Sequence, residues 1–124
     1  MRINLDMMNF LAKLVGHFEQ FKRMCMIRYA VMWKFKPSDG RSPKEIGEDV
    51  KEKYQSLMGL VPGLKNIEVG INRNESATAY DAMMIADFES WEALAAYKAD
   101  SMRDDVVKYV ETLIDVRARV EYER

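Results

Sequence analysis

The sequence predicts an α+β domain in which helices cover one face of a four-stranded antiparallel sheet. Strand-like and helix-like segments follow one another in the order strand, helix, strand, strand, broken helix, strand. A short polar connection joins the two middle strands, as in an antiparallel hairpin. The broken helix carries a capping signal at each of its two parts. These observations together favour a single α+β domain.

The four predicted strands are 26–36, 64–72, 80–88 and 115–123. The first places its large apolar side chains on one face: Ile27, Tyr29, Val31, Trp33 and Phe35. The third is apolar almost throughout. The last alternates most cleanly, with Val116, Ala118, Val120 and Tyr122 on one face and Asp115, Arg117, Arg119, Glu121 and Glu123 on the other.

Capping residues predict where the helices of the domain begin. Ser42, Pro43 and Glu45 form a capping box for a helix that runs to about Met58, before Gly59. The buried stripe of that helix is expected to contain Ile46, Val50, Tyr54, Leu57 and Met58. In the broken helix, Ser90 is expected to cap 91–97, and Ser101 with Asp104 to open 102–113.

This element order is that of a ferredoxin-like βαββαβ fold. The helices leave the second face of the sheet bare, and we expect groups such as Ala30, Met32 and Met84, or their neighbours, on that face. An apolar sheet face of this size is more often an interface than a solvent surface. The sequence therefore predicts a homodimer with the two sheets face to face.

Composition excludes several classes of protein. The 124 residues carry a net charge of -1 without a basic stripe, which argues against a nucleic-acid partner. No segment is as long and apolar as a membrane span, and we expect neither a signal peptide nor a membrane partner. One cysteine, Cys25, fits a reducing compartment, so we expect a cytoplasmic location. A single histidine, His17, cannot build a histidine-rich metal site, and no cofactor or metal is expected.

Residues 1–25 form a separate N-terminal extension, and 26–124 form the domain. Apolar residues recur at spacings of three and four, which predicts an amphipathic helix: Leu5, Met8, Leu11, Val15, Phe18 and Phe21. The extension is either a real helix, which the regular stripe favours, or the product of a start codon upstream of Met24 or Met26. A real helix must be buried against its own domain, a partner chain or a membrane. One hypothesis is therefore a scaffold protein that assembles through this helix.

Three stretches together resemble the stress-responsive α/β-barrel (Dabb) family, within the dimeric ferredoxin-like α/β-barrel superfamily: "MIRYAVMWKFK", "VPGLKNIEVGIN" and "AYDAMMIADFESWEALAAY". The likeness continues through "RARVEYE" and so covers 26–123. The resemblance implies a dimer whose two sheets form a barrel, and a small pocket between sheet and helices in each subunit. Most members of the family have no assigned activity.

A polyketide cyclase of this family has the segment Y-x-x-H-P-x-H, whose tyrosine and last histidine do acid–base work. This chain keeps Tyr97 but has Asp100, Ser101 and Arg103 at the other three positions, and Tyr29 where the first strand often has a histidine. Arginine stays protonated and cannot replace imidazole as a base, but it can bind an anion or stabilise an enolate. We therefore do not expect that cyclase chemistry here, and the missing histidines favour a binding protein over an enzyme without deciding between them.

The residues that we expect to line the pocket are Tyr29, Trp33, Tyr54, Tyr97 and Arg103. Such a pocket would take a small apolar or anionic ligand. The alternative function is a small-molecule enzyme, such as a cyclase, isomerase or monooxygenase, that uses Tyr97 and Arg103. A haem-degrading relative would need an axial histidine, for which only His17 is available.

Each of these residues also has an ordinary structural interpretation. The aromatic rings would be core residues, and the Tyr97 hydroxyl would have a hydrogen-bond partner. Asp100 and Ser101 would be helix caps, and Arg103 would form a solvated ion pair with the acidic residues that follow it. Cys25 has no nearby base in the sequence and is not a convincing nucleophile. On the last strand, Arg117 and Arg119 would face solvent or the barrel rim.

Overall fold

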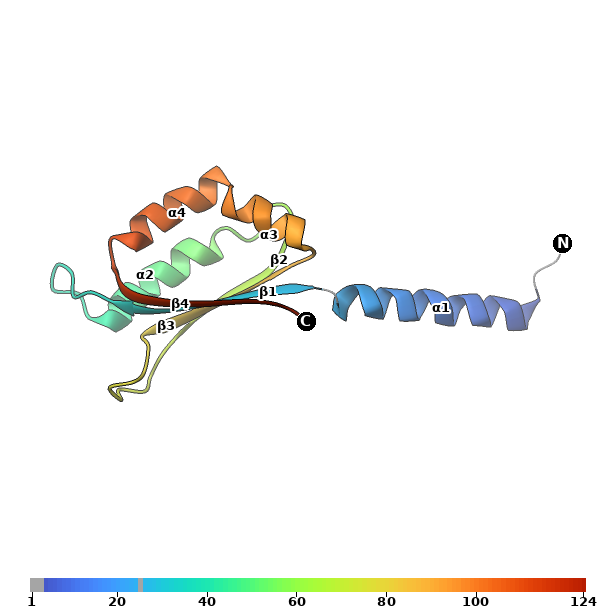
Figure 1. Ribbon diagram of the computed structural model, residues 1–124, viewed down its shortest axis with the longest axis horizontal. Coiled ribbons are helices and arrows are strands. Elements are labelled where there is room, and N and C mark those ends of the chain that lie inside the picture. The colour runs from blue at the N-terminus through green and yellow to red at the C-terminus, as the bar shows by residue number, and fades with distance from the viewer. Residues whose placement is uncertain (1–3, 25) are drawn as a thin grey trace.

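The computed structural model of the protein describes residues 4–24 and 26–124, with side chains for 4–15 and 26–124. Its elements in chain order are α1 (Leu5–Met24), β1 (Ile27–Phe35), α2 (Pro43–Gln55), β2 (Leu64–Ile71), β3 (Ala82–Phe88), α3 (Trp91–Lys98), α4 (Ser101–Glu111) and β4 (Ile114–Glu123). The predicted ferredoxin-like α+β fold and its N-terminal helix are confirmed (Figure 1). The side chains of His17, Phe18, Phe21 and Cys25, on which the sequence made predictions, lie outside the described residues.

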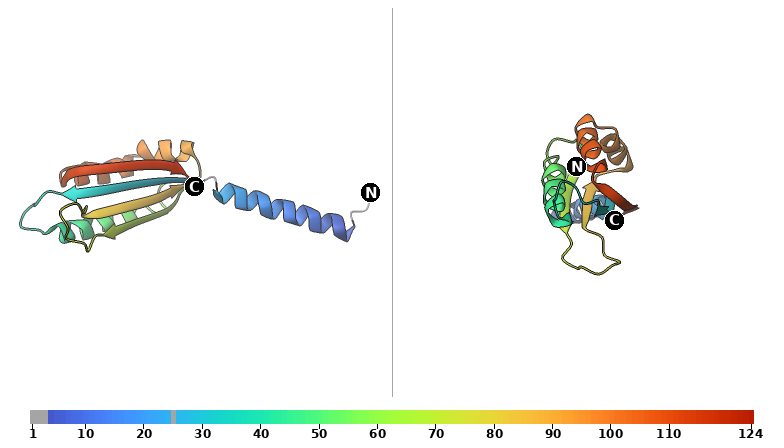
Figure 2. Two further views of the ribbon diagram at one scale, coloured as in Figure 1. Left: turned by 60° about the horizontal axis from the view of Figure 1, so that its bottom comes forward. Right: turned by 90° about the vertical axis from the view of Figure 1, so that its left-hand side faces the viewer.

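The four strands form one antiparallel sheet in the order β2-β3-β1-β4. Helices α2, α3 and α4 lie together on one face of it, as Figures 1 and 2 show. Strands β3 and β1 are hydrogen-bonded on both sides and form the centre of the sheet, whereas β2 and β4 are its edges.

The helix-covered face holds the core of the domain. The five large apolar residues predicted for one side of β1 are all at most 5% exposed: Ile27, Tyr29, Val31, Trp33 and Phe35. Their neighbours from β3 on that face are Ala82, Met84, Ala86 and Phe88, all buried. Strict alternation in β1 therefore decides which side of the sheet the helices cover.

The opposite face of the sheet, which we call the open face, is also apolar. Its side chains include Ala30, Met32, Met83, Ile85, Val120 and Tyr122, placed by the pairing register. Met32 and Met83 are each 37% exposed, and Val120 is 59% exposed. The prediction that Met84 lies on this face was wrong, because Met84 pairs with buried Val31 and is 1% exposed. A strand that is apolar on both sides gives no alternation from which to read its faces.

Helix α2 begins where the capping box predicted and ends earlier than predicted. The Glu45 backbone N–H donates to the Ser42 hydroxyl at 3.2 Å, with Pro43 as the first helical residue. The helix ends at Gln55, and 56–60 form turns. This early end turns Met58 outward to 46% exposure, so its predicted place in the buried stripe was wrong.

The break between α3 and α4 is made by two caps. Ser90 caps α3 as predicted and accepts a hydrogen bond from the Ala93 N–H at 3.0 Å. Asp100 rather than Ser101 caps α4, since its carboxylate accepts from the N–H groups of Met102 and Arg103. Aspartate competes well with serine for this position because its charged oxygen is the stronger acceptor.

The turn before β2 brings α3 against the sheet. Gly63 has a φ of +82°, and a Cβ there would lie 2.6 Å from the Cβ of Ala93 in α3. Glycine is required both for this backbone conformation and for this close approach. The contact fixes α3, and with it Tyr97, near the start of β2.

Helix α1 extends away from the rest of the chain (Figure 1). Its described large apolar side chains are exposed, from 41% for Met7 to 71% for Leu5. No helix in the described part of the chain is long and apolar enough to cross a membrane.

Candidate functional site

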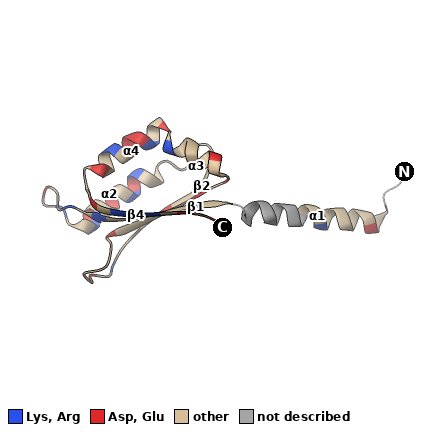
Figure 3. Ribbon diagram, in the orientation of Figure 1, with Lys and Arg blue, Asp and Glu red and all other residues tan. Residues whose placement is uncertain are grey.

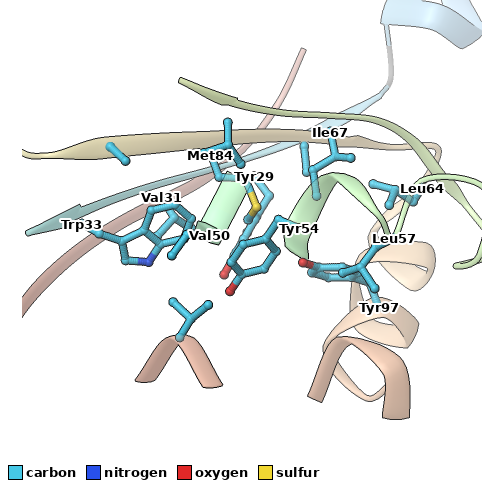
Figure 4. Close-up of a cluster of buried hydrophobic side chains, with 14 of the residues drawn as sticks. Tyr29, Val31, Trp33, Val50, Tyr54, Leu57, Leu64, Ile67, Met84 and Tyr97 are labelled. Carbon is cyan, nitrogen blue, oxygen red and sulfur yellow. The ribbon is translucent and has the colours of Figure 1, made fainter. Parts of the chain in front are cut away.

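Three tyrosines from three elements meet between the sheet and the helices. Tyr29 comes from β1, Tyr54 from α2 and Tyr97 from α3. Figure 4 shows their hydroxyl groups turned toward one region. The rings of Tyr29 and Tyr97 meet edge to face with centroids 6.3 Å apart. The structure thus gathers three of the five predicted site residues into one tyrosine cluster, which we define as Tyr29, Tyr54 and Tyr97.

Trp33 lies beside this cluster rather than in it. Its ring stacks on that of Tyr54 at 5.4 Å, and on that of Phe35 at 6.2 Å. It is 1% exposed and belongs to the packed core. Its role in the site is to hold the Tyr54 ring in place.

Arg103 supplies the one predicted cation of the site. Its guanidinium carbon lies 5.4 Å from the centroid of the Tyr97 ring, a cation–π contact. The Arg103 Nη1 donates to the Lys98 carbonyl at the C-terminus of α3 at 3.2 Å. The ion pair expected from the sequence is present, with Arg103 Nη1 3.8 Å from Asp104 Oδ1, but the Arg103 side chain is only 16% exposed, so its expected solvation was wrong. The carbonyl end of α3 compensates for the cation's unfavourable position in the first turn of α4.

Two polar atoms in this group are buried without a hydrogen-bond partner among the described residues: the Tyr97 hydroxyl and the Arg103 Nε. The Tyr97 ring is buried, as expected, but the satisfied hydroxyl expected with it is not found in the described chain. Buried polar groups are nearly always paired, and one left unpaired costs about 1–3 kcal/mol. Both groups are donors that face an aromatic environment.

Burial controls the protonation of Tyr97 and Tyr54. It raises the pKa of Tyr97 to about 12, although the nearby Arg103 guanidinium acts in the opposite direction. It also raises the pKa of Tyr54, and the neighbouring phenol of Tyr97 adds to that effect. Both phenols are therefore neutral near pH 7 and act as hydrogen-bond donors or acceptors rather than as bases.

Charged residues of β4 border the tyrosine cluster. In the register with β1, Glu121 lies opposite Tyr29 and Arg119 opposite Val31, so both face the helix side. Glu121 pairs with Lys98, whose ammonium nitrogen is 5.7 Å from the Tyr29 ring centroid. The expected exposure of Arg117 and Arg119 agrees with side chains that are 42% and 50% exposed. Figure 3 shows this charge on β4 and on the adjacent helices.

Lys98 and Glu121 were not among the residues predicted for the site. Lys98 follows Tyr97 directly, and Glu121 belongs to the charged face of the last strand. The alternation of that strand was visible, but which of its two faces the helices share depends on the register with β1.

The larger of two described cavities lies at another end of the molecule. It has a volume of about 770 Å³ and lies between the start of α2 and the β2–β3 connection. Its charged lining balances in sign: Lys44, Lys51 and Arg73 against Glu48, Glu75 and Asp81. This cavity contains none of the predicted site residues, and it was not predicted from the sequence. Its balanced charge and exposed loop favour a solvated groove.

No group of three or more histidine, cysteine or acidic side chains within the described residues is placed to hold a metal ion. The hydrogen-bond donors at this place are the phenols of the tyrosine cluster and the guanidinium of Arg103 beside it. Those groups suit an acceptor oxygen on a ligand.

Solved structures with this architecture come from several organisms. A dimeric ferredoxin-like protein of unknown function from Bacteroides fragilis has a TM-score of 0.70 at 21% identity, covering 80% of this chain and 96% of its own. Hydroxynitrile lyase from Passiflora edulis has a TM-score of 0.69 at 13% identity, covering 82% and 94%. SnoaB, a cofactor-independent oxygenase from Streptomyces nogalater, has a TM-score of 0.62 at 12% identity, covering 81% and 93%. At these identities the likeness establishes the fold.

Among curated proteins, none matches the chain in sequence. The family model of the stress-responsive A/B barrel domain matches residues 27–124, from the first residue of β1 to the end of the sequence. That range excludes α1 and includes the whole sheet, the three covering helices and the tyrosine cluster. The chain therefore belongs to the stress-responsive A/B barrel domain family.

Proposed function

We propose that the protein is a homodimer in which each subunit binds a small, largely apolar ligand with an anionic or acceptor oxygen. One observation carries the ligand proposal. The Tyr97 hydroxyl and the Arg103 Nε are buried donors without a partner among the described residues. A ligand oxygen between them would supply the missing acceptor, and the aromatic rings of Tyr29 and Tyr54 would pack against an apolar body.

The buried cation, rather than the charged border, favours an anionic ligand. Arg117 and Arg119 are exposed on the helix-facing side of β4, but they pair with Glu111 and Glu121, so their charge is balanced. Arg103 is only 16% exposed, and its Nε has no partner among the described residues. A buried guanidinium of this kind would bind an anionic oxygen more strongly than a neutral one.

Binding is better supported than turnover. The enzyme alternative uses Tyr97 and Arg103, but the Tyr97 phenol, with its raised pKa, donates a proton poorly and accepts one poorly near neutral pH. Arginine cannot act as a base. The lyase and oxygenase activities named above belong to those proteins, at identities that carry the fold alone.

Benzoate is a suitable probe for the ligand site, with benzyl alcohol as its uncharged counterpart. Because Trp33 stacks on Tyr54, its fluorescence should report occupancy of the cluster. We expect benzoate to bind the wild type more tightly than benzyl alcohol. Arg103→Gln should weaken benzoate binding at least tenfold, whereas Arg119→Gln, an exposed control on the same side of the sheet, should change it less than threefold.

Equal effects of the two arginine substitutions would mean that only the general positive field attracts benzoate. No difference between benzoate and benzyl alcohol would contradict an anion site. Either result would refute the proposed role of Arg103.

The open face supports the dimer. It places Met32, Met83 and Val120 in contact with solvent, and a hollow of about 310 Å³ lies beside Met32, Tyr80 and Met83. Exposed apolar patches with a polar border are typical of protein interfaces. Arg28, Asp87 and Arg124 provide such a border at one end.

Mixed isotope labelling tests the dimer directly. Methyl groups of Met32 and Val120 on the open face should show intermolecular nuclear Overhauser effects, whereas those of Val31 on the covered face should show none. Val120→Glu should remove the intermolecular signals. Their absence in the wild type at high micromolar concentration would refute this interface.

We also propose a cytoplasmic location, because a single cysteine fits a reducing compartment.

A further inference from the structure

Gly70 lies in β2 without a structural reason among the described residues of its own chain. Its φ is outside the left-handed region that favours glycine, and a Cβ there would meet no described atom within 4 Å. Gly70 is on the open face, because it pairs with Met83, which in turn pairs with Met32. Glycine weakens a strand and often marks a place where a ligand or another backbone approaches closely. The missing side chain therefore indicates a contact with something outside the chain.

The missing side chain at Gly70 leaves room for the hollow of about 310 Å³ on the open face. The side chains of Met32, Met83 and Tyr80 surround this hollow, and its lining contains no charged residue. The Lys34 ammonium nitrogen lies 5.2 Å from the centroid of the Tyr80 ring. Burial of a charge in such a place would be costly, so the hollow suits an apolar occupant.

Twofold symmetry limits what a second copy of the chain can place over the hollow. In a face-to-face dimer the axis lies between the two sheets, and packed sheets keep their strands within about 30° of each other. The axis therefore runs either across the strands or along them. Strands β2 and β4 are the two edges of the sheet (Figure 2). An axis across the strands places β2 over β2 of the other chain, whereas an axis along them places β2 over β4.

The two edge strands present different side chains on the open face. The register places three residues of β2 there: Asn66, Glu68 and Gly70. It places four residues of β4 there: Val116, Ala118, Val120 and Tyr122. If β2 covered the hollow of its own copy, only an amide and a carboxylate would be available to fill it, at a cost in desolvation. Strand β4 offers apolar side chains and no charge, so β4 is the better occupant.

The charges on the central strands favour the same arrangement. On the open face, β1 carries Arg28 near one end and Lys34 near the other, whereas β3 carries Asp87. An axis across the strands would place β1 over its own copy in the reverse direction, with Lys34 over Arg28. An axis along the strands places β3 over β1 at the same level, with Asp87 over Arg28. Opposite charges then meet across the interface, and like charges are kept apart.

We propose that the twofold axis of the dimer runs along the strands, so that β4 of each chain covers the hollow at Gly70 of the other. The proposal rests on the proposed function, because it takes the face-to-face dimer as given. An axis along the strands preserves the level of each residue, and Ala118 is at the level of Gly70 because it pairs with Met32. Ala118 of one chain therefore lies opposite Gly70 of the other, with Val116 and Val120 on either side.

Charge complementation between two variants tests this arrangement. Gly70→Glu and Ala118→Lys each bring an unpaired charge to the interface, so each alone should weaken dimerisation by about tenfold or more. An equimolar mixture of the two should restore dimers. Each mixed dimer pairs the new glutamate with the new lysine at one contact and keeps the wild-type contact at the other. The two side chains can together span the roughly 10 Å between packed sheets.

The matched control is an equimolar mixture of Gly70→Glu with Gly70→Lys, which an axis along the strands leaves unpaired. Sedimentation equilibrium measures the dimer affinity, and native mass spectrometry identifies the mixed dimers. Neither position belongs to the domain core, so circular dichroism should show that all variants are folded. If Ala118→Lys does not fold, Val120→Lys provides a second partner for Gly70→Glu.

The outcomes separate this proposal from the dimer on which it rests. A wild-type protein that stays monomeric at high micromolar concentration would refute the dimer itself. With a dimeric wild type, recovery only in the control mixture would mean that β2 lies over β2, and would overturn the proposed axis. Recovery in neither mixture would mean that β4 does not cover the hollow. Single variants that dimerise as tightly as the wild type would place Gly70 and Ala118 outside the interface, which would also overturn the proposal.

Discussion

Both faces of the sheet are apolar, but one is buried under helices and the other is partly exposed. Adjacent residues of β1 illustrate this, since Trp33 is 1% exposed and Met32 is 37% exposed. Helices α2, α3 and α4 pack on the covered face. Its aromatic rings include tyrosines, whose hydroxyl groups are buried with them. The open face carries methionine and β-branched residues, and its main buried polar residue is Asp87. The comparison shows that apolar character alone does not identify the core, because the same strands present it on both sides.

The largest difference between the faces should appear when neighbouring residues of β1 are truncated. Trp33→Ala removes a ring that stacks on two others and should lower the free energy of unfolding by about 3–5 kcal/mol. Met32→Ala on the open face should lower it by under about 1 kcal/mol in the monomer. Chemical denaturation of both variants measures this contrast, and equal losses would mean that the open face is also part of the core.

The next effect comes from the buried acid of the open face. Asp87 is 4% exposed and accepts two hydrogen bonds from Arg28, at 2.9 and 3.1 Å. Burial opposes its ionisation, but the hydrogen bonds and charge of Arg28 outweigh it and keep the pKa of Asp87 below its ordinary value. Asp87→Asn should cost about 2 kcal/mol at pH 7, less than a fully buried pair because Arg28 is 23% exposed.

The direction of the pH dependence follows from that lowered pKa. The stabilisation by Asp87 is fully present above the unfolded-state pKa, near 4, and is lost as the pH falls through the lower folded-state value. The free energies of unfolding of the wild type and of Asp87→Asn, measured by denaturation, should therefore converge at acid pH. Glu68→Gln, an exposed control on β2, should not change how much the free energy of unfolding falls at acid pH. If the free energies of unfolding of the wild type and Asp87→Asn differ by the same amount at every pH, the ionised Asp87 does not supply this stabilisation.

A smaller effect of opposite sign is expected on the covered face. Tyr97→Phe removes a buried hydroxyl that has no partner in the described chain, so it should raise the free energy of unfolding by about 1 kcal/mol without ligand. The same change should weaken benzoate binding. A protein that becomes more stable as it loses binding would show that the hydroxyl serves a ligand. A loss of stability would mean that the hydroxyl has a partner in the free protein.

The smallest predicted effect is spectroscopic. Burial raises the pKa of Tyr97 to about 12, so the free energy of unfolding should not depend on Tyr97 ionisation below about pH 10 and should fall as the pH rises toward 12. Ultraviolet titration should show a late tyrosine ionisation near pH 12, or ionisation coupled to unfolding. Tyr97→Phe should remove one such step, and an unchanged titration would contradict the raised pKa.

Much of the fold could be predicted from the sequence because its signals are local. The alternation in β1, the capping box at Ser42 and the cap at Ser90 depend on residues a few positions apart. Errors arose where the local pattern is ambiguous. Met84 lies in a strand that is apolar on both sides, and Ser101 stands next to a stronger cap, Asp100.

The element order, the covered side of β1 and the burial of its aromatic residues follow from the residue pattern alone, because side-chain periodicity is set by backbone geometry. What surrounds those residues depends on tertiary contacts. The tertiary structure brought Tyr29, Tyr54 and Tyr97 together from three elements, and it turned Arg103 inward onto the end of α3. Whether a buried hydroxyl has a partner depends on groups far apart in the chain, and the register between strands, not the order of residues, places those groups.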